Sequence, residues 1–78
     1  MTLRTCSPTT LRALGRRIAE ARQRKDWSQA QLARATGVSP RGVAYLERGE
    51  REPMYSTLWA VAVALDTTPT YLWSGIRE

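Results

Sequence analysis

The hydrophobic positions of the chain fall into short segments with helical spacing. The first segment has four apolar residues at i, i+3, i+7 and i+10, namely Leu11, Leu14, Ile18 and Ala21. Because this spacing places them on one face, we expect a helix from about Leu11 to Lys25 with Arg12, Arg16 and Gln23 outside. An earlier start fits equally well, with Ser7 as N-cap and Pro8 as the first helical residue. Residues 1–10 have no periodicity and are expected to form an arm.

The next two segments are shorter and have clear start and stop signals. Ser28 opens a second helix, because Gln31 follows three residues later in a capping-box pattern. Gly37 supplies a left-handed stop after about two turns. A third helix is expected over residues 39–48, with Ser-Pro at its start and Gly at its end. The sequence therefore predicts two short helices in close succession.

The last third of the chain predicts two further helices. From about Tyr55 to Leu65 the sequence is rich in Ala and Val and uncharged, so we expect this helix at the centre of the core. Thr68 and Pro69 then repeat the cap-and-Pro start, and a short helix containing residues 71–73 ends at Gly75. No strand alternation is present. The chain is therefore predicted to be all-α, with five helices and a single domain over residues 11–76.

Residues 28–49, SQAQLARATGVSPRGVAYLERG, describe a helix-turn-helix. Two short helices joined by a Gly-containing turn set the second helix across the first, so that it projects. Ala33 is small enough for the crossing, Gly37 provides the positive φ of the turn, and Val38 fills the space beneath it. Each feature alone is common in helices, but their combined spacing is specific to a helix-turn-helix.

Through SQAQLA, GVS, YLERGEREP and residues 58–65, the chain resembles the Cro and phage-repressor-like (XRE) helix-turn-helix family. The resemblance covers roughly residues 11–75. It implies a compact five-helix, lambda-repressor-like fold that binds operator DNA as a two-fold dimer. The small size is similar to that of Cro-type regulators and of restriction–modification controller proteins.

The resemblance also implies DNA contacts at particular positions. Gln29 matches the family Gln that bonds a phosphate, the alternative being an exposed Gln in the first helical turn. The recognition helix, residues 39–48, would lie in the major groove. Its groove-facing positions are Ser39, Pro40, Arg41, Ala44 and Tyr45. Arg41 is best equipped to read sequence, because its guanidinium fork can bond guanine O6 and N7 together, whereas a phosphate clamp is the alternative.

Other residues receive supporting roles. Arg48, Arg51 and Arg34 are candidates for backbone contacts. Gly42 replaces the Ser or Thr common in the family, and either admits the DNA backbone or merely weakens the helix. The resemblance implies an internal ion pair of Arg22 with Glu47. It also implies dimer contacts at four positions, Tyr71, Leu72, Trp73 and Pro53.

Composition further limits the classes of function that fit this chain. The 78 residues carry 12 Lys+Arg and 7 Asp+Glu, a net charge of +5, and residues 1–25 alone carry +6. Such clustering favours a polyanionic partner. With no His and one Cys, Cys6, the chain lacks the usual metal ligands, an internal disulfide and an obvious general base. We therefore expect no enzyme activity, metal or cofactor. The longest apolar run, residues 58–65, has eight residues, so a cytoplasmic protein without membrane contact is expected.

These observations predict a homodimeric, sequence-specific regulator that binds double-stranded DNA at a palindromic operator. The alternative is a protein-interaction module of the same fold, such as an antitoxin or an adaptor. Glu50 and Glu52 are either solvated charges or, in an activator, a contact for RNA polymerase. Arg4 in the arm is a candidate for the minor groove.

Overall fold

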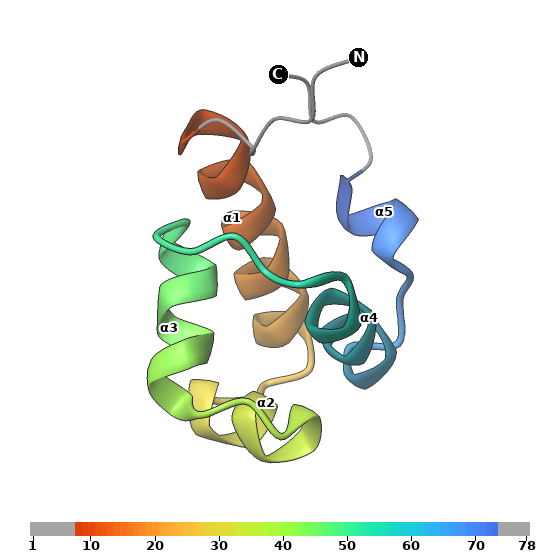
Figure 1. Cartoon of the computed structure of the whole chain (residues 1–78). Helices are drawn as coiled ribbons and strands as arrows, with labels where there is room; N and C mark the ends of the chain where they lie inside the picture. The colour runs from red at the N-terminus through yellow and green to blue at the C-terminus, as the bar shows by residue number, and fades with distance from the viewer. Residues whose placement is uncertain (1–7, 74–78) are drawn as a thin grey trace.

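The structure, a computed structural model, describes residues 8–73. In that range the chain forms five α-helices and no strand (Figure 1). They are α1 (Pro8–Arg24), α2 (Gln29–Thr36), α3 (Pro40–Arg48), α4 (Tyr55–Ala64) and α5 (Pro69–Trp73). The predicted all-α, five-helix fold is confirmed. Arg4, Cys6, Ser7 and Gly75, which the sequence analysis singled out, lie outside the described residues.

The first helix begins inside the segment, residues 1–10, that was expected to form an arm. α1 starts at Pro8, so residues 8–10 are helical and the earlier of the two expected starts is correct. A proline suits the first helical turn because its fixed φ is helical and its missing N–H has no intrahelical acceptor there. Thr10 is 3% exposed, so this first turn already packs against the domain.

The caps of α2 and α3 are those that the sequence predicted. Ser28 Oγ accepts the N–H of Gln31 at 3.1 Å, and Gln31 Oε1 accepts the N–H of Ser28 at 2.7 Å. Ser39 Oγ accepts the N–H of Gly42 at 3.0 Å and so caps α3. Gly37 and Gly49 end the two helices at φ 79° and 72°. Both turns therefore use the one residue type that adopts this conformation without steric cost.

The core lies between the five helices: α1 and α2 pack against α3, α2 and α5 pack against α4, and α5 also contacts α1. Its buried apolar residues are Leu14, Ile18, Ala21, Leu32, Ala33, Val43, Leu46, Leu58, Val61, Ala62, Leu65 and Leu72. Trp27, Val38, Ala64 and Trp73 pack against this cluster from its edge. The expected apolar face of α1 is thus confirmed for Leu14, Ile18 and Ala21, whereas Leu11 is half-buried.

α4 contributes to the core as expected, but only one of its sides is buried. Leu58, Val61 and Ala62 are buried, but Tyr55 and Trp59 on the other side are 70% and 52% exposed. A helix at the edge of so small a domain can cover only one face, whatever its composition. An uncharged sequence therefore did not mean a fully buried helix.

α1 and α3 approach each other at two glycines. A Cβ at Gly15 would lie 2.4 Å from the carbonyl oxygen of Leu46 and 2.5 Å from that of Glu47. A Cβ at Gly49 would lie 2.7 Å from the backbone nitrogen of Arg12. Since no side chain fits at such distances, the two backbones touch directly. This contact fixes the position of α3 on the domain.

Candidate nucleic-acid interface

α3 presents its first turn to solvent. Ser39, Pro40 and Arg41 are all exposed, while Ala44 and Tyr45 farther along the helix are half-buried. No hydrogen bond or ion pair joins Arg41 to any other described residue. Its guanidinium is therefore available for an external acceptor. Figure 1 shows α3 on the side of the domain opposite α4 and α5.

A shallow hollow lies over the turn between α2 and α3. Most of its lining residues are small, among them Ala30, Ala33 and Gly37, and Arg34 and Ser39 line it as well. Small side chains here leave room for a ligand backbone to approach the capped N-terminus of α3. That N-terminus carries partial positive charge from the helix dipole. The turn is thus suited to a phosphate in both shape and charge.

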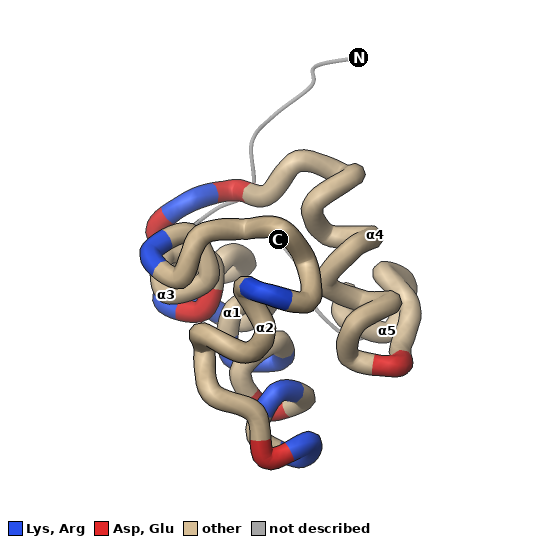
Figure 2. Tube along the Cα trace, turned by 90° about the horizontal axis from the view of Figure 1, so that it is seen from below, with Lys and Arg blue, Asp and Glu red and all other residues tan. Residues whose placement is uncertain are grey.

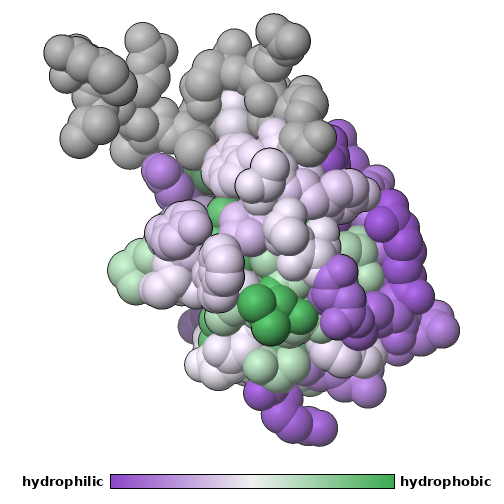
Figure 3. Space-filling model, turned by 90° about the vertical axis from the view of Figure 1, so that its right-hand side faces the viewer, coloured by the Kyte–Doolittle hydropathy of each residue, from purple (hydrophilic) through white to green (hydrophobic). Residues whose placement is uncertain are grey.

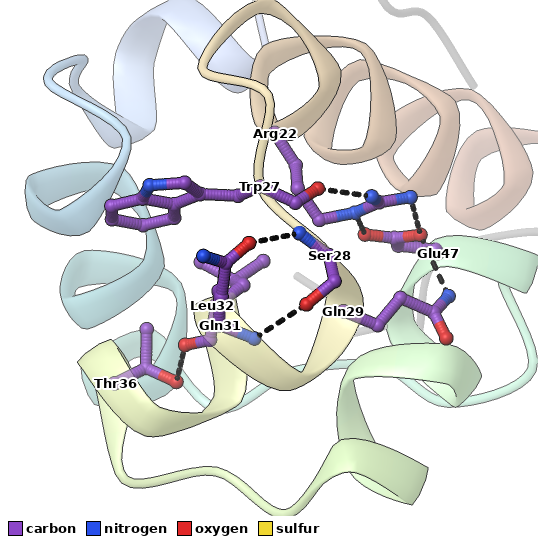
Figure 4. A network of polar contacts seen from close by, with 8 residues as sticks. All are labelled: Arg22, Trp27, Ser28, Gln29, Gln31, Leu32, Thr36 and Glu47. Carbon is purple, nitrogen blue, oxygen red and sulfur yellow. Dashed lines mark hydrogen bonds and ion pairs between the residues drawn. The ribbon is translucent and has the colours of Figure 1, made fainter.

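Glu47 connects three elements beneath the exposed side of α3 (Figure 4). Arg22 of α1 donates to Glu47 from Nε at 2.6 Å and from Nη2 at 3.1 Å. Arg22 Nη1 also donates to the carbonyl of Trp27 at 2.7 Å, just before α2. The Arg22 and Glu47 side chains are only 13% and 6% exposed. The internal pair that the resemblance implied is therefore present and sits in a largely dry environment.

Gln29 is the third partner of this carboxylate. Its Nε2 donates to Glu47 Oε1 at 2.9 Å, so the first residue of α2 is held against α3. The side chain is half-buried rather than freely exposed. Its amide oxygen accepts no hydrogen bond that appears in Figure 4. Gln29 thus has a structural role, and a phosphate contact would come in addition to it.

A second cluster surrounds Tyr45 at the C-terminal end of α3. The guanidinium carbons of Arg48 and Arg51 lie 5.4 Å and 5.0 Å from the centre of its ring, within range of cation–π attraction. Arg48 also forms a two-point pair with Glu50, at 3.0 Å and 3.2 Å. This hydrogen bond lowers the pKa of Glu50 and raises the pKa of Arg48. The positive charge of Arg48 is therefore partly neutralised within the chain.

The structure explains Gly42 through packing. A Cβ at this position would lie 2.8 Å from Cγ1 of Val38 and 3.2 Å from Oγ of Ser39. The missing side chain therefore makes room for Val38 beneath the turn and for the capping hydroxyl. This is a third reason for the glycine, which neither of the two sequence interpretations contained.

The four residues predicted for a dimer interface do not form one exposed patch. Leu72 is 0% exposed and belongs to the core, so its assignment to an interface is wrong. Among the five residues of α5, Leu72 is the buried one, and its side chain holds the helix against the core. Trp73 and Pro53 are half-buried, and Tyr71 is 41% exposed beneath the guanidinium of Arg17, 5.5 Å from its ring centre.

Sequence reasoning missed the largest exposed apolar side chains. These are Met54, Tyr55, Trp59 and Val63, between 52% and 70% exposed. The signal was available in the sequence, since residues 55, 59 and 63 are four apart and therefore lie along one side of the helix.

A compact bundle with a capped helix-turn-helix and an exposed arginine on its second helix defines a helix-turn-helix domain of the DNA-binding type. Residues 18–72 match the model of the family HTH_3, helix-turn-helix. The chain belongs to this family, and within it to the Cro and phage-repressor-like (XRE) proteins.

Two solved structures are similar over most of this chain. The restriction–modification controller protein C.AhdI from Aeromonas hydrophila superposes with a TM-score of 0.80 at 34% identity, covering 82% of this chain and 97% of that one. The P22 c2 repressor in complex with a synthetic operator gives a TM-score of 0.76 at 37% identity, covering 80% and 94%. The lambda-repressor-like fold is thereby confirmed.

Curated relatives are longer. An uncharacterised HTH-type transcriptional regulator of Mycobacterium tuberculosis is 49% identical over 55 residues, which are 70% of this chain and 22% of that protein. The regulator SutR of Escherichia coli is 40% identical over 70% of this chain and 31% of its own length. The chain thus spans less than a third of these relatives. In the described residues, no helix is long and apolar enough to cross a membrane.

Proposed function

We propose that this protein is a sequence-specific transcription regulator that binds double-stranded DNA as a homodimer. Each copy places α3 in the major groove of one half of a palindromic operator. The observation that carries the proposal is the exposed side chain of Arg41 at the start of the capped helix α3, where no other described residue binds it. The P22 c2 repressor, whose structure includes an operator, supports it by similarity. The proposal assigns no catalytic step to the chain.

The side chains divide into two roles. Arg41 reads a base edge, because its fork matches guanine O6 and N7. Ser39 and Pro40 border the same groove, and Ala44 and Tyr45 follow one turn later. Gln29, Arg34, Arg48 and Arg51 contact phosphates and set the register without reading sequence. Two half-sites about 34 Å apart would match the two-fold symmetry of the dimer.

A protein-interaction module of the same fold is the alternative. One structural relative, SinR, was solved as a complex with the protein SinI, at 28% identity and a TM-score of 0.76. The exposed apolar side of α4 is compatible with a protein partner as well. An antitoxin or adaptor would use such a surface instead of Arg41.

Salt dependence separates the two functions. Fluorescence anisotropy on a labelled duplex should show affinity falling steeply between about 50 and 200 mM salt, because phosphate neutralisation releases counterions. Arg41→Ala should reduce the preference for a selected duplex over a scrambled one. Affinity that is independent of salt, or no binding to any duplex, would contradict DNA binding and favour the interaction module.

A further inference from the structure

α4 has an exposed apolar side that is not used by the proposed DNA interface. Tyr55, Trp59 and Val63 are 70%, 52% and 58% exposed, and Met54, directly before the helix, is 70% exposed. We call these four residues the α4 stripe. Since residues four apart lie one above the other on a helix, Tyr55, Trp59 and Val63 form a continuous row along α4. The rings of Tyr55 and Trp59 are 6.2 Å apart and form its broad end.

The middle of the stripe is free of charged residues, whereas Arg51 and Glu52 line the same hollow as Met54 at its N-terminal end. α4 contains no charged residue between Tyr55 and Ala64, and Figure 2 shows α4 and α5 almost entirely without charge. Figure 3 views this side of the molecule: white and green atoms fill its centre, and hydrophilic atoms gather along the right edge. At the C-terminal end of α4, Asp66 is paired with Lys25 at 2.7 Å. An apolar centre with charge at the border is the usual composition of a protein interface.

The size of the stripe matches a small dimer interface. With side chains of up to about 150–250 Å² each, the exposed parts of the four residues amount to roughly 500 Å² on one copy. Pairing two copies would bury about 1,000 Å² in total, or somewhat more with the neighbouring Tyr71, which is 41% exposed. This is about the minimum for a biological interface and lies below the roughly 1,200–2,000 Å² of stable specific ones. A patch of this size is also at the upper end of what monomers expose.

We infer that the occupant of the α4 stripe is the α4 stripe of a second copy, packed antiparallel about a two-fold axis at Trp59. The inference rests on the proposed homodimer and gives it an interface. In an antiparallel pair, the bulky Tyr55 of one copy faces the small Val63 of the other, and each Trp59 meets its symmetry mate. Because α4 itself contains no charged residue, no charge of α4 meets its symmetry mate at the two-fold axis.

The same arrangement is compatible with DNA binding. Figures 1 and 2 both show α3 on one side of the monomer and α4 with α5 on the other. Pairing through α4 therefore leaves Arg41 exposed on both copies. Interfaces built on α5 alone would offer much less apolar surface, because Leu72 is buried and Tyr71 is partly covered by Arg17.

Disulfide trapping tests the register directly. In a Cys6→Ser background, which removes the one native thiol, Tyr55→Cys and Val63→Cys are purified separately, one with a mass tag. When the two are mixed under mild oxidation, the mixed disulfide should form at least about tenfold faster than with Ala35→Cys, an exposed control on α2. A mixed rate equal to the control would overturn the inference. Faster trapping of each variant with itself would overturn the antiparallel register.

Sedimentation equilibrium separates this inference from the proposed function. Trp59→Glu should remain helical by circular dichroism and raise the dimer dissociation constant at least about 100-fold, whereas Arg41→Ala should remain dimeric and lose specific DNA binding. A dimeric Trp59→Glu variant that still binds DNA would overturn the α4 interface and leave DNA binding intact. A wild-type chain that binds its DNA only as a monomer would overturn the homodimer itself.

Discussion

The carboxylate of Glu47 in α3 receives two hydrogen bonds from the guanidinium of Arg22 in α1, at 2.6 Å and 3.1 Å. A third comes from Gln29 at the start of α2. Figure 4 draws no other polar network that joins α1, α2 and α3. The direction of α3 relative to the rest of the domain therefore depends on this largely buried charge pair together with the backbone contact at Gly15 and Gly49.

Removing that carboxylate should destabilise the domain strongly. Glu47→Ala leaves the Arg22 guanidinium in a largely dry site without its counter-ion, which costs about 3–5 kcal/mol of the free energy of unfolding. Urea denaturation followed by circular dichroism measures the loss. Glu50→Gln, which breaks the fully exposed pair with Arg48, is the control and should leave the urea midpoint unchanged. Equal stability of the Glu47→Ala variant and wild type would contradict this role.

The backbone contact at Gly15 should be equally sensitive. Gly15→Ala places a methyl group within 2.4 Å of the Leu46 carbonyl oxygen, so α1 and α3 must move apart. We expect a loss of about 3 kcal/mol in unfolding free energy, at the upper end of overpacking costs. Gly37→Ala is the matched control: nothing lies within 4 Å of its Cβ, and only the positive φ is strained. Its loss should be about 1–2 kcal/mol.

The sequence allowed the helices and their ends to be predicted wherever the signal is local. Ser28, Ser39 and the two terminating glycines act on their own backbone neighbours, so their patterns can be recognised without tertiary information. Burial of α4 and Leu72 could not be predicted in the same way. Which face of an apolar helix is covered depends on partners far along the chain. Composition alone does not contain that information.

The candidate site was predictable to a similar extent. The Arg22–Glu47 pair followed from matching positions 25 residues apart to a family pattern. The contact of Gln29 with the same carboxylate, and the two arginines around Tyr45, required the distances themselves. The space that Val38 needs at Gly42 likewise appears only when the backbone is in place.

Arg41 and Gln29 should differ in how their loss affects binding. If Arg41 reads a base, Arg41→Ala should cost about 1–3 kcal/mol on the operator and relax preference at one position in each half-site. Gln29→Ala should weaken all duplexes alike and also lower stability by about 1 kcal/mol through its bond to Glu47. Competition binding with single-base operator variants measures both effects. Uniform weakening by Arg41→Ala would make it a phosphate contact.

Glu50 should oppose DNA binding. It holds Arg48 in a two-point pair, and its removal would leave that guanidinium free for a phosphate. Glu50→Gln should therefore tighten binding severalfold at low salt and increase the salt slope by about 1. Unchanged affinity and slope would show that Arg48 makes no phosphate contact.

The pH dependence of this pair follows from the direction of its pKa shift. Hydrogen bonding to Arg48 lowers the pKa of the Glu50 carboxyl below its usual 4.5, so the pair is intact above that value. It is lost only as the pH falls through the lowered pKa. Affinity measured between about pH 6 and 8 should therefore show no contribution from Glu50 titration. A severalfold change in that range that disappears in Glu50→Gln would contradict the assignment.

Selection of bound sequences from a random duplex pool tests the central claim most directly. The account predicts that wild-type protein enriches one inverted repeat whose half-sites are about one helical turn apart, with a guanine in each half-site that Arg41→Ala no longer selects. Recovery of the starting pool unchanged, with no repeat and no preferred base, would contradict sequence-specific binding by a homodimer.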